Sequence, residues 1–330
     1  MTAANKNPHS TWQLVSVASV LHLLVDSICI CCLYLLLPAM PFHLIVAVVA
    51  VYNVLAFLTQ PLTGLLADRL AAVHWLLMIA VVLLTVGALS TLCARMSPSS
   101  PVVLFAIASF LGIGNSLFHV WGGRMTAVRT QNDIRALGAF VSTGAFGLAI
   151  GGVFFSWPML LVQLCALFAC SLLVLYIDRL PQAIPSITPS VHSMTTPNLT
   201  PWVVATLLLL LMVFVMLRSL LSQTFSSALS STDAFILTAA AVAMGGKLAG
   251  GWIAYHLGWI RTLILIAIAV FGCCLVKDSG TVVLLAGLFL VNCSMPVTLY
   301  LANRLLPGRE GLAFGLLAAA LVPGFLLAIL

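Results

Sequence analysis

The chain has 330 residues, of which 63% are hydrophobic and 6% charged, and its mean hydropathy is +1.22. A soluble domain carries about 25% charged residues, so this composition excludes a water-soluble globular protein and predicts an all-α polytopic membrane protein. The net charge of +6 does not indicate nucleic-acid binding, because the basic residues stand singly at helix ends and form no stripe.

Long apolar runs follow one another along the whole chain, without the alternation that a membrane β-barrel requires. The first run is too long for a cleaved signal peptide, and no small-x-small cleavage site follows it. We predict eleven membrane-spanning helices, at residues 12–37, 42–66, 74–94, 101–122, 135–156, 158–177, 202–223, 234–256, 260–276, 281–302 and 310–330.

The distribution of basic residues predicts the orientation. Of the 13 basic residues, nine fall on the side of the amino terminus and two, Arg95 and Lys277, on the opposite side; Arg218 and Lys247 lie within helices. Because Lys and Arg are enriched in cytoplasmic loops, we expect a multi-pass protein of the cell inner (plasma) membrane with a cytoplasmic amino terminus.

One segment differs in composition from the rest. Residues 181–201 are rich in Pro, Ser and Thr and contain too little apolar surface to fold, which indicates a cytoplasmic linker. The linker divides an amino-terminal six-helix bundle, residues 1–180, from a carboxy-terminal bundle of about five helices, residues 202–330.

The two halves share a repeat. Residues 64–70, Gly-Leu-Leu-Ala-Asp-Arg-Leu, have a degenerate copy at 251–257, Gly-Trp-Ile-Ala-Tyr-His-Leu. A polar residue precedes each copy by four positions, Gln60 in the first and Lys247 in the second. A membrane protein built from two copies of one unit is typical of transporters, in which the halves move about a central site.

A second repeat fixes the correspondence between helices. Arg124 and Arg129 follow the fourth predicted helix, and Arg304 and Arg309 follow the tenth at the same spacing. The tenth helix therefore corresponds to the fourth and the eleventh to the fifth, and the sequence lacks a twelfth.

The stretch Gly64-x-x-x-Asp68-Arg69, between the second and third predicted helices, resembles the signature loop of the major facilitator superfamily. This resemblance implies a fold of two helical bundles and transport by alternating access. It also implies that Gly64, Asp68 and Arg69 form a gate, with Asp68 bound to a basic residue or a helix amino terminus of the other half and Arg69 bound to a cytoplasmic acid. Lys247, in the second copy, is assigned to the gate with them.

Within that superfamily, the chain is most similar to the fosmidomycin-resistance-like efflux proteins. The similarity rests on His22-x-x-x-Asp26, on Phe118-His119, on Arg218-Ser219, and on residues 305–313, Leu-Leu-Pro-Gly-Arg-Glu-Gly-Leu-Ala. It implies export of a small organic compound in exchange for protons. The fifth helix lacks the Gly-Pro pair typical of antiporters, so uptake stays open as an alternative.

Asp26 is the carboxylate that we place deep within a helix, with His22 one turn before it on the same face. A charge at the bilayer centre costs about 2.5–3.5 kcal/mol on insertion scales, which favours a functional role in binding protons or substrate over a purely structural polar pair. Arg218 lies at a similar depth in the other half and could face Asp26 across a central cavity, where it would hold a substrate anion or poise Asp26; alternatively it extends outward to the membrane interface.

His119 and Asn115, one turn apart in the fourth helix, are further candidates for lining the cavity, although a membrane histidine can also be a packing residue. Asn53 and Asn292 are weaker candidates, since single amides commonly join helices.

Cys29-x-Cys31-Cys32, near His22, suggests copper or zinc, but residues at this spacing point around most of a helix circumference. We therefore expect no metal and no cofactor, with the proton as the coupling ion. No nucleophile elbow, phosphate-binding glycine loop or zinc-binding His-Glu motif is present, so we do not expect an enzyme.

The sequence thus predicts a secondary active transporter that acts as a monomer. Its expected partners are the lipid bilayer and a small-molecule substrate, with drugs and antibiotics as candidates. The alternatives are an uptake permease of the same superfamily, or a truncated or non-transporting membrane scaffold or sensor.

Overall fold

The structure is a computed structural model that describes residues 8–70, 73–96, 100–179 and 199–329. Within this part of the chain every regular element is a helix. The helices are α1 (Pro8–Leu36), η1 (Leu37–Ala39), α2 (Phe42–Asn53), η2 (Val54–Leu58), α3 (Gln60–Arg69), α4 (His74–Met96), α5 (Pro101–Arg129), α6 (Ile134–Val153), α7 (Trp157–Arg179), α8 (Pro201–Ser227), α9 (Asp233–Leu257), α10 (Trp259–Leu275), η3 (Lys277–Ser279), α11 (Thr281–Cys293), α12 (Met295–Leu305), α13 (Glu310–Ala319) and α14 (Leu321–Ile329).

The predicted spanning segments agree with the structure in number. Nine helical segments of the described chain are long and apolar enough to cross a membrane, and two shorter apolar helical segments, Trp259–Leu275 and Glu310–Gly324, fill the remaining predicted positions. The second and fourth predicted helices end too early, since the structure continues them to Arg69 and Arg129. Arg124 therefore lies inside a helix and not in the loop after it.

Three predicted helices are interrupted in the structure, the second predicted helix by the π-helical segment η2 between α2 and α3. The segment predicted as one helix over 281–302 divides at Ser294 into α11 and α12, and Pro296 opens α12. The last predicted helix divides at Ala320, with Pro323 in the first turn of α14. Proline has no backbone N–H and its ring clashes with the preceding turn, so an apolar run that contains it can span a membrane without being one regular helix.

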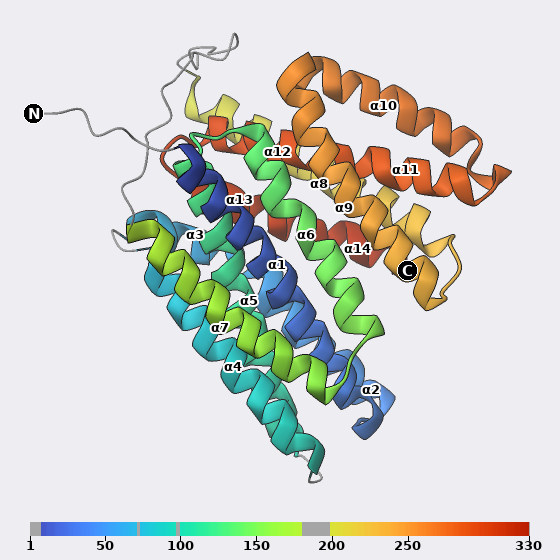
Figure 1. Ribbon diagram of the computed structural model, residues 1–330. Coiled ribbons are helices and arrows are strands. Elements are labelled where there is room, and N and C mark those ends of the chain that lie inside the picture. Colours follow the sequence, from blue (N-terminus) through green and yellow to red (C-terminus); the bar gives the residue numbers. More distant parts are fainter. Residues whose placement is uncertain (1–7, 71–72, 97–99, 180–198, 330) are drawn as a thin grey trace, which may run out of the picture.

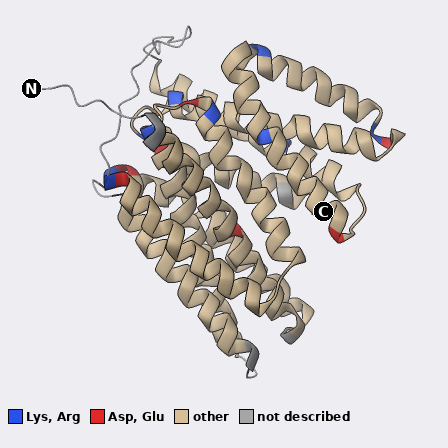
Figure 2. Ribbon diagram, viewed as in Figure 1, with Lys and Arg blue, Asp and Glu red and all other residues tan. Residues whose placement is uncertain are grey.

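The helices form two bundles, α1–α7 and α8–α14, which converge where α3, α12 and α13 lie and diverge toward the opposite end (Figure 1). At the boundary between them α6 packs along α9, and α3 packs on α13. Charged residues gather mainly at helix ends (Figure 2). Residues 180–198, most of the predicted linker, lie outside the described residues, so the domain boundaries remain a prediction.

The core lies mainly in the amino-terminal bundle, around α1. In its most apolar window 72% of the residues of α1 are buried, against 11% for α8. The central position of α1 brings its polar face against α5 and α6, which is where the candidate site lies.

Candidate functional site

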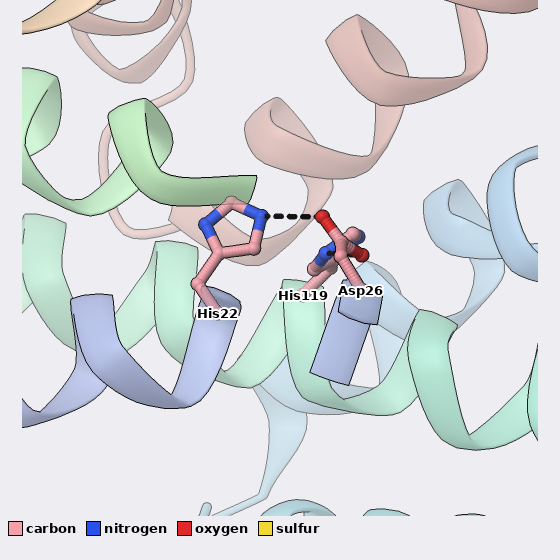
Figure 3. A group of neighbouring side chains, drawn as sticks. All are labelled: His22, Asp26 and His119. Atoms are coloured by element: carbon pink, nitrogen blue, oxygen red, sulfur yellow. Dashed lines mark ion pairs between the residues drawn. The ribbon is translucent and has the colours of Figure 1, made fainter. Parts of the chain in front are cut away.

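Three buried ionisable side chains meet inside the amino-terminal bundle. His22 and Asp26 come from one face of α1 and His119 comes from α5, and each is at most 6% exposed. His22 Nε2 lies 3.4 Å from Asp26 Oδ2, and His119 Nε2 lies 3.2 Å from Asp26 Oδ1 (Figure 3). The predicted pairing of His22 with Asp26 on one helical face is confirmed, and the structure adds His119 to it.

Asn115 completes the surroundings of the carboxylate. Its Nδ2 donates a hydrogen bond of 3.0 Å to Asp26 Oδ1, and the amide is fully buried. Asn115 and His119 are one turn apart on α5, so one helical face presents both groups to Asp26. Asn115 therefore contacts the carboxylate directly.

Helix α6 covers the site from the other side, and Gly144 allows it to do so. A Cβ at Gly144 would lie 2.4 Å from His22 Nε2 and 2.5 Å from Asp26 Oδ2, closer than any van der Waals contact. One turn earlier on α6, the Phe140 ring stacks on the His22 imidazole with the ring centroids 4.8 Å apart. The glycines of α6 are thus required for this helix to pack closely on α1.

The hydrogen bonds of His22 determine where its protons are. His22 Nδ1 lies 2.8 Å from the backbone carbonyl oxygen of Phe140, which only accepts hydrogen bonds, so Nδ1 carries the proton. In a neutral imidazole Nε2 is then an unprotonated acceptor, facing an Asp26 oxygen at 3.4 Å. Two acceptors repel, so one further proton must lie between His22 Nε2 and Asp26 Oδ2 for this arrangement to be favourable.

Gln60 determines the protonation of His119 in the same way. Its Nε2 donates to the carbonyl oxygen of Ala56 at 2.8 Å and lies 3.3 Å from His119 Nδ1. An amide NH₂ only donates, so His119 Nδ1 accepts and Nε2 carries the single ring proton. His119 Nε2 lies 3.2 Å from Asp26 Oδ1, without the alignment of a hydrogen bond. The hydrogen bond of Gln60 thus fixes the ring nitrogen of His119 that accepts, and the further proton of the site lies between His22 and Asp26.

The same three side chains have the spacing of a metal site, since one ligand atom from each lies within 4.8 Å of the others. Two histidines and a carboxylate suit a divalent transition metal. However, a metal needs an unprotonated His119 Nε2, and the tautomer imposed by Gln60 is the opposite one. The geometry as it stands favours a proton.

The cysteines of α1 do not form a shared site. Cys29 Sγ lies 3.9 Å from the carbonyl oxygen of Leu111, whereas Cys31 Sγ lies at the same distance from that of Ser156, in another part of the bundle. Asn292 binds the hydroxyl of Ser222 and so joins α11 to α8. Asn53 bonds within its own helix, to the carbonyl oxygen of Val49.

The two cations of the second half lie in the interior. Arg218 on α8 is 6% exposed, and Lys247 on α9 is half-buried. Among the described residues there is no ion pair between Arg218 and Asp26, which the sequence placed at similar depths. The backbone carbonyl of Lys247 instead lies against Gly138 of α6. Its assignment to the gate stays a prediction.

The gate residues of the first repeat join the two bundles. Asp68, at the end of α3, accepts hydrogen bonds from the backbone N–H groups of Gly311 at 2.8 Å and Leu312 at 2.9 Å, in the first turn of α13. Arg124 Nε adds a bond of 3.1 Å to the same carboxylate. A carboxylate at a helix amino terminus satisfies free N–H groups and interacts favourably with the helix dipole. The expected contact is present; its role as a gate stays a prediction.

Gly64 allows the two helices to approach this closely, because a Cβ there would lie 2.3 Å from the carbonyl oxygen of Gly311. Arg69 does not behave as expected. Its side chain is exposed and makes no ion pair with any residue that the structure describes.

A second junction between the bundles was missed from the sequence. The Arg135 guanidinium lies 3.8 Å from the ring centroid of Tyr255 and 5.4 Å from that of Trp252, both on α9. Asp133 accepts from the backbone N–H of Arg135 and so caps α6 itself. Tyr255 occupies the place that Asp68 has in the first repeat, so the repeat marks both junctions although the acid became an aromatic residue.

The turn between α5 and α6 forms a third junction. Gln131 and Asn132 have positive φ angles of 54° and 62°, which aim Asn132 at α12. Asn132 Nδ2 donates to the carbonyl oxygen of Tyr300 at 3.1 Å, and its Oδ1 accepts from Asn303 at 2.8 Å. The hydrogen bonds that Asp68 and Asn132 form between the bundles all lie at this end, which the positive-inside pattern predicts to be cytoplasmic.

Similar folds occur among solved structures. The chain superimposes with a TM-score of 0.60 on a major facilitator transporter, FucP, in the outward conformation, at 14% identity over 95% of this chain and 91% of that one. The fold is that of the major facilitator transporters. A variant of the E. coli fucose:proton symporter FucP gives a TM-score of 0.63, at 14% identity over 96% and 90% of the two chains.

A third structure with a similar fold is a bacterial homologue of the iron transporter ferroportin in an outward-facing state, with a TM-score of 0.61 at 17% identity over 96% and 90% of the chains. No protein-family model and no curated protein sequence matches the chain. The structural likeness therefore establishes the fold, and the function has to be inferred from the geometry of the site.

Proposed function

We propose that the chain is a major facilitator transporter, a secondary active transporter that moves a small organic compound across the inner membrane by alternating access, coupled to protons. The observation that carries the proposal is the buried group formed by His22, Asp26 and His119, in which His22 Nε2 and Asp26 Oδ2 face each other at 3.4 Å. An ionisable group held within a membrane bundle is costly and is typical of proton-coupled transport.

The mechanism follows from the geometry of the site and of the junctions. The exchangeable proton neutralises the pair His22–Asp26 and removes the repulsion between its facing acceptors. Its release restores the repulsion between His22 and Asp26, and this changes the surface on which α6 packs through Gly144; α6 also packs along α9 of the other bundle. Protonation thereby biases the boundary between the bundles, and the Asp68 junction opens and closes with it.

The direction of transport has two candidates. The resemblance to fosmidomycin-resistance-like proteins favours export, by antiport with protons, of a drug or similar compound. Two unpaired cations of the carboxy-terminal bundle, Arg218 and Lys247, favour uptake together with a proton. We further propose that the protein acts as a monomer, has its amino terminus in the cytoplasm, and has no enzymatic activity.

Replacing Asp26 by asparagine tests the proposal. The amide keeps the size of the side chain but cannot take part in proton exchange, so transport driven by a pH gradient should be abolished while the protein remains folded. Two readouts apply: drug susceptibility of an efflux-deficient bacterium over a panel that includes fosmidomycin, and pH change inside proteoliposomes.

Asp278→Asn is the matched control, because Asp278 is an exposed acid in the short helix η3. It should leave transport unchanged. Full activity of the Asp26→Asn variant would refute the proton site, and failure of wild-type protein to transport in either assay would count against a transporter.

A further inference from the structure

Arg218 is a buried cation without a partner. It is 6% exposed, it makes no hydrogen bond or ion pair with any described residue, and its Nε is a buried donor left unsatisfied. Leaving a buried charge uncompensated is costly, and a guanidinium cannot relieve this cost by losing its proton. Its counter-charge must therefore come from outside the bundle.

Lys247 is the second cation of this region. Its backbone carbonyl lies against Gly138 of α6, so this part of α9 packs on the amino-terminal bundle. Its ammonium is repelled by Arg218 and attracted by Asp26, and it makes no hydrogen bond or ion pair within the described chain. This stretch of α9 thus faces α6, the helix that also packs on α1 at the proton site.

The carboxy-terminal bundle has no acid that could neutralise them among its described residues. The chain has seven acidic residues, of which three lie in the second half. Asp233 and Glu310 lie in the first turns of α9 and α13, and Asp278 lies in η3. All three are at helix ends, away from the interior position of Arg218.

We propose that Arg218 and Lys247 bind the anionic group of the transported compound, which is a small organic anion such as a carboxylate or a sulfonate. The inference rests on the proposed transport function and names its substrate class. A guanidinium offers paired N–H donors that match two oxygens of such a group, and the ammonium adds a point charge.

The position of Lys247 links anion binding to the proton. Charged Asp26 competes with the substrate anion for Lys247, whereas Asp26 that shares a proton with His22 leaves Lys247 free. Proton and anion therefore strengthen each other's binding, which is the coupling that transport of both in the same direction requires. Among the described residues, the titratable or charged groups that interact with Asp26 are His22 and Cys29 of α1, Tyr52 of α2, His119 of α5 and Lys247 of α9.

Anion binding to the purified full chain tests this inference. The probe is methanesulfonate, whose charge does not change with pH, and its neutral counterpart is dimethyl sulfone; ligand-dependent thermal stabilisation gives the affinity. Wild-type protein should bind methanesulfonate and not dimethyl sulfone, at least about tenfold more tightly at pH of about 5.5 than at about 8. The variants Arg218→Gln and Lys247→Gln should each lose at least about tenfold, while Lys247→Arg retains binding.

Two further variants separate the outcomes. Arg261→Gln, at an exposed position on α10, should bind as the wild type does. Asp26→Asn, which mimics the protonated carboxyl, should bind tightly at both pH values. Absence of binding by the wild type, or wild-type affinity in Arg218→Gln and Lys247→Gln, would overturn the anion site. An affinity of the wild type that is independent of pH would overturn its link to the proton. Transport that is proton-driven but shows no anion binding would remove this inference and leave the proposed function intact.

Discussion

Replacing Asp68 by asparagine should weaken the junction between α3 and α13. Asp68 accepts one backbone N–H with each oxygen, from Gly311 and Leu312, and asparagine keeps only one of these acceptors. Losing a hydrogen bond to a charged group costs about 1.5–3 kcal/mol. Removing the charge from the helix amino terminus costs about a further 0.3–1 kcal/mol. The total of about 2–4 kcal/mol shifts the equilibrium toward the open junction roughly 30- to 900-fold.

Hydrogen exchange measures this shift directly. The amides of Gly311 and Leu312 lie in the first turn of α13, where no carbonyl of the same helix can accept from them, so their protection depends on Asp68. Mass spectrometry of this turn should show much faster exchange in the variant. Asp178→Asn is the control, because Asp178 pairs with His74 inside the amino-terminal bundle. Unchanged exchange in Asp68→Asn, or equal acceleration in both variants, would refute the reasoning.

Two other substitutions probe the packing of α6. Gly144→Ala places a Cβ 2.5 Å from Asp26 Oδ2, so it should lower the free energy of unfolding by about 1–3 kcal/mol and abolish transport. Gly272→Ala is the control, because a Cβ there has no atom within 4 Å and should change neither quantity. Thermal unfolding and transport assays measure the two effects. Tyr255→Leu removes the aromatic partner of Arg135, worth about 0.5–2 kcal/mol, and should lower the unfolding midpoint. Tyr255→Phe keeps the ring and should not, so equal losses in both variants would count against a cation–π contact.

The sequence predicted those parts of the site that depend on local geometry. His22 and Asp26 are four residues apart on one helix, so their pairing follows from the helical repeat alone. The proton positions were beyond the sequence, because they depend on a carbonyl of Phe140 and an amide of Gln60, brought in by other helices. Such contacts follow from tertiary packing, and Gln60 was noticed only for its place in the repeat.

The junctions show a similar limit. Asp68 was found because its loop resembles a known signature, and its partner was correctly expected to be a helix amino terminus or a base. The Tyr255 junction was missed because Tyr255 stands where the first copy of the repeat has an acid, and replacement of an acid by an aromatic residue suggests that the contact between the bundles has been lost. Its geometry shows a change of chemistry, since Arg135 is a cation that an aromatic face can bind. Hydropathy likewise could not place the break at Ser294, because both parts of that segment are apolar.

The origin of the proton site in the first bundle has a consequence for biogenesis. His22, Gln60, Asn115, His119 and Phe140 all precede the end of α7, so a nascent chain contains the whole site before any residue of the second bundle is synthesised. Asp26 can form its contacts as soon as α5 and α6 pack on α1. The free-energy cost of an unpaired carboxylate in the membrane is therefore removed before the second bundle is synthesised. Gly138 and Gly64 lie on the surface of this first bundle, and the later helices α9 and α13 then pack against them.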